Sequence, residues 1–263
     1  MRNKSPTRNI YPATFAVLCI LGGAANADDF SAYTKALNVL GEPAPRPSVG
    51  LVASGFGASA GQMFVGVSYT DRDEQTDGSD NDGSIVIGRG FGDPSTALGT
   101  ELTIGITSVS TSLWGDGKFA DEGNLNIKLY REISLPMPFG RSSVAFGVSN
   151  LAGWGATTDN PKNVYAVLTA SQALGEFSEY GALYTIGYGT GVSDAETGSD
   201  FFGGIGIGRG DYSASLSFIG GDLHLTGNWY PSFYENAVIS YSRSDFTNNS
   251  GLERNIISFG LSF

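Results

Sequence analysis

The sequence predicts an all-β fold, namely a transmembrane antiparallel β-barrel of about 12 strands with up-and-down topology. After residue 61, apolar and polar residues alternate with a period of two, which is the pattern of a half-apolar strand. The second face of these runs carries mostly Ser, Thr, Gly and Asn, and charged residues make up only 16% of the chain. A soluble sheet would expose many charges, so a lipid-facing wall around a polar lumen fits this pattern better.

The first residues predict export. Three basic residues precede an apolar stretch at 13–24, and Ala-Asn-Ala then ends at Ala27. This order of basic, apolar and small residues is typical of a secretory signal peptide, so we assign 1–27 to it, with cleavage after about Ala27. Cys19, the one cysteine, lies inside the apolar stretch, so neither a disulfide nor a thiolate metal site is expected in the exported chain.

Residues 28–61 differ in pattern from the rest of the chain. Apolar residues at helical spacing in 28–42 allow one short amphipathic helix, and three prolines between 43 and 47 then indicate an extended linker. The Gly-rich stretch 49–60 fits neither period. We therefore expect 28–61 to be a periplasmic N-terminal segment and linker, and 62–263 to be the outer-membrane β-barrel.

The strands are expected at 62–71, 83–91, 99–110, 122–132, 141–151, 162–173, 180–190, 201–209, 211–219, 222–230, 236–245 and 253–263. Most have the length of about 9–11 residues with which a tilted strand crosses a bilayer. Because open sheet edges do not persist in hydrocarbon, the sheet should close. With the N-terminus in the periplasm, the long acidic or polar connections such as 72–82 and 191–200 lie outside the cell.

Two groups of candidate site residues follow from the alternation of side chains between the two faces of each strand and from their positions along it. The larger polar residues expected to face the lumen are Glu101, Lys128, Tyr130, His224 and Asn228. Aromatic and basic residues near strand ends are expected at the membrane interface, where such residues form girdles or extend to head groups; they are Tyr69, Arg89, Tyr165, Arg209, Tyr212, Trp229 and Phe263.

The last strand carries a resemblance. Its alternating apolar residues from Asn255 to a final Phe263 resemble bacterial outer-membrane proteins, and this resemblance implies recognition by the barrel-assembly machinery. The stretches Gly90-Phe91-Gly92-Asp93-Pro94 and Gly220-Gly221-Asp222 also resemble the barrel part of YjbH-like exopolysaccharide-associated proteins.

The expected function is a narrow porin-like channel or envelope scaffold of the bacterial outer membrane that is not an enzyme. The formal net charge of −11 argues against nucleic acid as a partner. Outer-membrane lipid and small solutes are the expected partners, and no cofactor or metal site is expected. The acidic outer connections would bias a pore toward cations. Clustered acids between Asp71 and Asp82 leave Ca²⁺ binding open, although their spacing is not that of an EF-hand.

Two other functions remain open at this stage. One is a lipid-modifying enzyme of the outer membrane that uses His224, the one histidine. A hydroxyl nucleophile would need a positioned base and a third, orienting group, and no such set is evident. The other is the barrel component of a polysaccharide exporter, with 28–60 as its periplasmic contact. The sequence leaves open the solute, the oligomeric state and whether the lumen is open.

Overall fold

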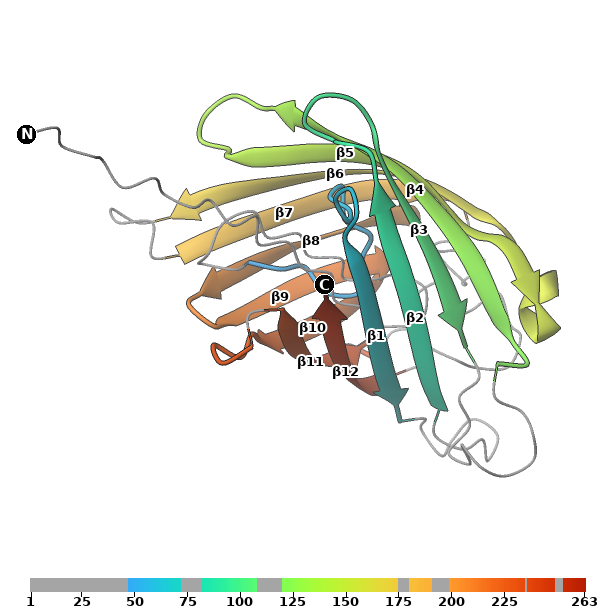
Figure 1. The fold of residues 1–263 in the computed structure, drawn as a ribbon. Coiled ribbons are helices and arrows are strands. Elements are labelled where there is room, and N and C mark those ends of the chain that lie inside the picture. The colour runs from blue at the N-terminus through green and yellow to red at the C-terminus, as the bar shows by residue number, and fades with distance from the viewer. Residues whose placement is uncertain are drawn as a thin grey trace, which may run out of the picture.

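The protein forms a closed barrel of antiparallel strands (Figure 1). The computed structural model describes residues 47–71, 82–107, 120–174, 180–190, 199–234, 236–248 and 253–263. The strands are β1 (Met63–Thr70), β2 (Asp82–Phe91), β3 (Gly99–Ile106), β4 (Gly123–Ser134), β5 (Arg141–Trp154), β6 (Asn163–Leu174), β7 (Tyr180–Gly189), β8 (Ser199–Arg209), β9 (Tyr212–Gly220), β10 (Asp222–Trp229), β11 (Ala237–Ser244) and β12 (Arg254–Ser262).

Each strand pairs with its neighbours in the chain, and β1 closes the sheet on β12 in the register Val67↔Phe259. The predicted closed, up-and-down barrel is thereby confirmed, and all twelve strands lie close to their predicted ranges. The largest differences are at β3, which ends at Ile106, and at β5, which continues to Trp154. Closure pairs the backbone groups that an open sheet edge would leave without partners.

The two faces of the wall differ as the alternation predicts. On β9, Tyr212 and Leu216 are exposed outward, whereas Ser213, Ser215 and Ser217 are buried on the inward face. Elsewhere the outward rows are equally apolar, and Phe146 and Ile186 are 65% and 56% exposed. Such a continuous apolar exterior fits hydrocarbon as its surrounding medium.

A charge on this exterior is expected to destabilise the barrel in lipid. Ile186 lies in the middle of β7 and points outward. Replacing Ile186→Arg should lower the free energy of unfolding by about 2–4 kcal/mol, because the guanidinium would enter the hydrocarbon. Urea titration of the protein in lipid vesicles measures this loss, with Ile186→Leu as the control of similar volume. An unchanged unfolding free energy for the arginine variant would contradict a lipid-facing wall.

The two ends of the barrel carry different connections. The "short-turn end" holds the β2–β3, β4–β5, β6–β7, β8–β9 and β10–β11 connections. The "long-connection end" holds the others, most of which lie outside the described residues, including 72–81 with its acidic cluster and 191–198. At that end the β5–β6 connection folds into a 3-10 helix, η2 (Gly155–Asp159). No helix in the described part of the chain is long and apolar enough to cross a membrane.

The core of the molecule lies inside the barrel. Residues 47–58 run through the interior, between the wall formed by β1 and β2 and the wall formed by β7 to β9 (Figure 1). From 47 to 58 every residue is buried. We call residues 48–58 the inner segment.

Candidate functional site

The inner segment crosses the full width of the lumen. At one end, Ser48 lies against Gly206 of β8, and at the other end Ala58 lies against Gly90 of β2. These two strands are six apart in a ring of twelve, so they face each other across the barrel. Residues 28–61 were expected to be periplasmic. Residues 47–58 lie inside the barrel instead, because the polar wall supplies hydrogen-bond partners for a backbone that would otherwise be unpaired.

The first end of the inner segment is held by hydroxyl and amide groups. The Ser48 hydroxyl lies 2.9 Å from the hydroxyl of Ser213 on β9. Asn228 on β10 donates from Nδ2 to Ser48 Oγ at 2.6 Å and accepts from Ser240 Oγ at 2.6 Å. This network lies toward the short-turn end, where β9 begins and β10 ends.

The middle of the inner segment is held through its backbone at two glycines. Gly50 N donates to Ser215 Oγ at 2.9 Å, and Ser217 Oγ donates to the Gly50 carbonyl at 2.8 Å. Gly55 N donates to Thr169 Oγ1 at 2.8 Å, and Ser143 Oγ donates to the Gly55 carbonyl at 2.6 Å. The wall therefore satisfies both backbone groups of each glycine with short side chains from β5, β6 and β9.

The second end of the inner segment is held by charged and phenolic groups. Glu101 on β3 and Lys128 on β4 face each other in register, with Lys128 Nζ 3.3 Å from Glu101 Oε1. Lys128 Nζ also donates to the Phe56 carbonyl at 2.7 Å, and Glu101 Oε2 accepts from Ala58 N at 2.9 Å. The Tyr130 hydroxyl donates to the Ala58 carbonyl at 2.6 Å. The ion pair is buried, and each of its members holds one backbone group of the inner segment.

The inner segment is held by side chains of the wall and does not join the sheet, because each strand of the barrel pairs only with its two neighbouring strands. A neutral hydrogen bond of this kind contributes about 1 kcal/mol net, and one to a charged group about 1.5–3 kcal/mol. Several such bonds act together here, so the segment is held firmly. None of these bonds belongs to the ladder of hydrogen bonds between the strands of the barrel.

The close approach of the inner segment to the wall requires glycine on both sides. A Cβ at Gly206 would lie 1.6 Å from the Ser48 carbonyl oxygen, and one at Gly90 would lie 2.0 Å from the Ala58 carbonyl oxygen. Within the segment, a Cβ at Gly55 would lie 2.3 Å from the Ser143 carbonyl oxygen. These distances are shorter than any real Cβ contact, and two of the three glycines belong to the wall.

Apolar packing adds to the polar contacts. The inner segment and the wall form one cluster, which comprises Val49, Val52, Ala53, Phe56, Tyr130, Ala145, Val167, Leu183, Phe202 and Ile219, with Tyr165 packed against it. Leu51 is 1% exposed and adopts a φ of 62°, a left-handed conformation that is uncommon for a branched side chain. The cluster joins the inner segment to inward side chains of β4 to β9.

The residues predicted to face the lumen all lie on the inward face. Glu101, Lys128, Tyr130 and Asn228 contact the inner segment. His224 instead lies near the long-connection end and is 1% exposed.

The surroundings of His224 fix its tautomer. The backbone N–H of Asp245 donates to His224 Nδ1 at 3.1 Å, and the Ser244 hydroxyl lies 3.0 Å from the same nitrogen. Nδ1 is therefore an acceptor, and the ring proton is on Nε2. Because the ring is buried on the inward face, the geometry gives it no access to a lipid on the outside.

All but one of the residues predicted at the membrane interface are exposed on the outward face. They are Tyr69, Arg89, Arg209, Tyr212, Trp229 and Phe263. The Arg209 guanidinium lies 4.9 Å from the centre of the Tyr180 ring.

The prediction for Tyr165 is wrong. Its ring points inward and packs edge-on against Phe202, with ring centres 6.4 Å apart. The absence of a side chain at Gly147 makes room for the ring, because a Cβ there would lie 2.2 Å from the Tyr165 Cζ atom.

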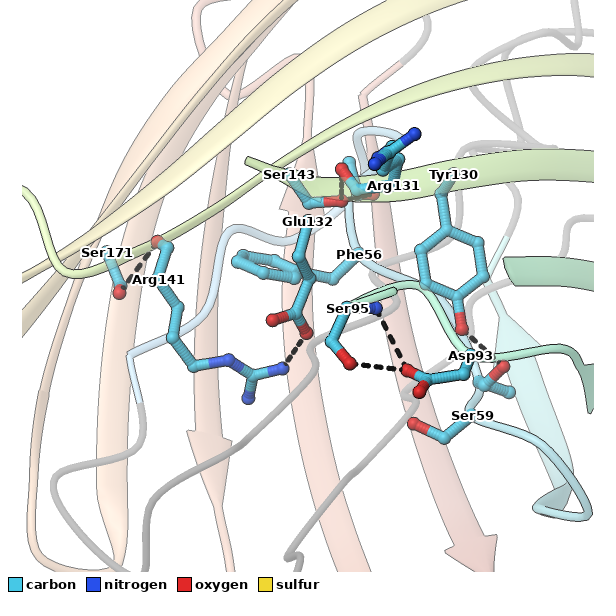
Figure 2. Close-up of polar contacts among 12 residues, drawn as sticks. Phe56, Ser59, Asp93, Ser95, Tyr130, Arg131, Glu132, Arg141, Ser143 and Ser171 are labelled. Atoms are coloured by element: carbon cyan, nitrogen blue, oxygen red, sulfur yellow. Dashed lines mark hydrogen bonds and ion pairs between the residues drawn. The ribbon is translucent and has the colours of Figure 1, made fainter. Parts of the chain in front are cut away.

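The opening at the short-turn end contains a charged pair beside the inner segment. Figure 2 shows Arg141 of β5 paired with Glu132 of β4, near the Phe56 ring. The guanidinium carbon of Arg141 lies 5.4 Å from the centre of that ring.

The neighbouring β2–β3 turn is organised by Asp93, which accepts hydrogen bonds from the Ser95 backbone and side chain at 2.9 and 2.6 Å (Figure 2). These bonds, together with one from Thr96, hold the pKa of the Asp93 carboxyl below its ordinary value.

Comparison with known proteins supports the fold and leaves the function open. No family model matches the chain, and no curated protein gives a significant match. Among solved structures, a KdgM porin aligns with a TM-score of 0.50 at 10% identity, over 76% of this chain and 99% of that one. The outer membrane protein Omp33 of Acinetobacter baumannii aligns with a TM-score of 0.42 at 10% identity, over 77% of this chain and 98% of that one. The fold is therefore a closed barrel of twelve antiparallel strands, similar to the fold of the KdgM porin, and the inner segment lies inside this barrel. The resemblance to YjbH-like proteins finds no support among these neighbours.

Proposed function

We propose that the protein is a narrow porin-like channel of the bacterial outer membrane whose resting state is closed by its own inner segment. The observation that carries the proposal is the construction of the lumen. Beside the apolar cluster, many of its inward residues are serine, threonine, asparagine and glycine, which suit a water-filled path, and the segment that lies in this path pairs with no strand of the sheet. A scaffold would need no such separable filling, because wall side chains alone can close a barrel.

The polar interior also bears on the solute. In the described part of the chain, the charged side chains that are fully buried are Glu101, Lys128 and Asp245, and the first two neutralise each other. A polyanion would need a row of cations, so this interior favours small uncharged polar solutes. The outward apolar face, the exposed aromatics near strand ends and the porin-type fold support a location in the outer membrane.

The test uses a chain that can be cut after it has folded. Ala60 and Gly61 are exposed, so a protease recognition sequence inserted between them should be cleavable in the intact barrel. Cleavage leaves the inner segment held only by noncovalent contacts, and a wash in urea too dilute to unfold the barrel then removes it. We call the washed product the emptied barrel.

Planar-bilayer recording compares the emptied barrel with the uncut protein of the same sequence. The proposal predicts that the uncut protein is closed nearly all the time and that the emptied barrel conducts steadily. Retention of the folded barrel is checked by its resistance to unfolding in gel electrophoresis without heating. If the emptied barrel is folded but does not conduct, the proposed channel function is wrong, and the envelope scaffold is the function that remains.

A further inference from the structure

We infer that the groove filled by the inner segment is a peptide-binding site, and that the open barrel retains short, uncharged, glycine-containing peptides in extended conformation. This inference rests on the proposed function, because it assumes that the segment can leave. Its basis is the chemistry that the wall presents to a backbone.

Side chains of the wall form hydrogen bonds with the backbone N–H and carbonyl groups of the inner segment. At Gly50 and again at Gly55 it offers one acceptor to the N–H and one donor to the carbonyl. At Ala58 the carboxylate of Glu101 takes the N–H and the hydroxyl of Tyr130 reaches the carbonyl. Donors and acceptors therefore alternate along the groove in the order in which a polypeptide displays its own groups.

The wall also selects side chains by size. In the inner segment, a Cβ at Gly50 would meet Thr226 Oγ1 at 2.1 Å, and one at Gly57 would meet the Tyr130 ring at 2.6 Å. Gly55 faces backbone atoms of Ser143, which cannot rotate away. Between these glycines the groove accepts apolar side chains such as Val52. A ligand thus needs glycine at three set positions and tolerates apolar residues between them.

Charge excludes other ligands of similar length. The ion pair of Glu101 and Lys128 is internally neutral, with Nζ and Oε1 3.3 Å apart. A charged ligand side chain placed there would be desolvated without a partner of its own. The groove therefore favours uncharged peptides.

The chain's own segment has an advantage over a free ligand. A covalently attached segment acts at an effective concentration in the millimolar range, so a free peptide competes poorly until the tether is cut. Binding is for this reason measured on the emptied barrel described above, in detergent micelles, and needs no current to flow.

The experiment is a fluorescence-polarisation titration with a labelled synthetic peptide of residues 47–60, which carries no charged side chain. The inference predicts saturable binding to the emptied barrel. A peptide with Gly55→Val should bind about tenfold more weakly or worse, because its Cβ would overlap backbone atoms of β5. A peptide with Ala60→Val is the matched control, since Ala60 is exposed, and it should bind like the parent.

Two results would overturn the inference. One is the absence of saturable binding to an emptied barrel that is still folded, and the other is equal binding of the parent and Gly55→Val peptides. Neither result bears on the proposed channel function, because only the conductance measurement tests that function. Conversely, if the emptied barrel binds the peptide but never conducts, the peptide-binding site stands and the proposed channel function is wrong.

Discussion

Replacing Lys128→Met is expected to lower the free energy of unfolding by about 3–5 kcal/mol, because it leaves the buried carboxylate of Glu101 without its cation. Glu101 and Lys128 are 3% and 4% exposed, so water screens the remaining charge poorly. The variant also loses the hydrogen bond from Nζ to the Phe56 carbonyl, which weakens the hold on the inner segment. Urea titration in lipid vesicles, followed by tryptophan fluorescence, measures the change.

The matched control is the double variant Lys128→Met with Glu101→Gln. It removes both charges and keeps an acceptor oxygen for the Ala58 N–H. The double variant should recover most of the stability lost in the single one, since no unpaired charge remains. A single variant as stable as the native chain, or a double variant that is worse, would show that this pair is hydrated rather than buried.

Replacing Gly206→Val is expected to expel the first end of the inner segment. The new Cβ would lie 1.6 Å from the Ser48 carbonyl oxygen and 2.5 Å from its carbonyl carbon. Overpacking of this kind costs about 1–3 kcal/mol, which is comparable to the bonds that Ser48 makes with Ser213 and Asn228. The strain can therefore be relieved by releasing that end of the segment while the sheet stays closed.

Thiol labelling measures the release. In a Ser48→Cys background without Cys19, a water-soluble maleimide should react on the order of tenfold faster when Gly206→Val is present. The matched control is Gly227→Val on β10, where nothing lies within 4 Å of the added Cβ. Equal labelling rates in the Gly206 and Gly227 variants would contradict the tight contact at Ser48.

The wall of the barrel was predictable because lipid and lumen impose alternation on every strand. The ranges expected for β7 and β12, for example, differ from the observed bounds by one residue at most at each end. The error at Tyr165 has a local cause. An aromatic residue near a strand end suits the interface as well as the interior, and only the cross-strand Gly147 shows which face has room for it.

The inner segment was not predicted because its stabilisation is not periodic. Its backbone is satisfied by single side chains from distant strands, such as Thr169 and Ser215, and neither a helical nor a strand period results. Two signals were nevertheless present in the sequence. The 49–60 stretch is rich in glycine, and β9 presents three inward serines in a row. A row of hydroxyls inside a barrel can bind water or a segment of the chain, so this signal alone does not distinguish an open lumen from an occupied one.

The location of the inner segment inside the lumen can be trapped chemically by a disulfide between positions 48 and 213. The two serine hydroxyl oxygens are 2.9 Å apart, which is close enough for cysteines there to form the 2.03–2.05 Å sulfur–sulfur bond with small adjustments. The variant Ser48→Cys with Ser213→Cys, lacking Cys19, is treated with a mild oxidant in proteoliposomes. We expect nearly complete loss of free thiols within single folded barrels, whereas the pair Ser48→Cys with Ser84→Cys on β2 should stay reduced. Free, fully reactive thiols at 48 and 213 in a folded barrel would contradict this location of the inner segment.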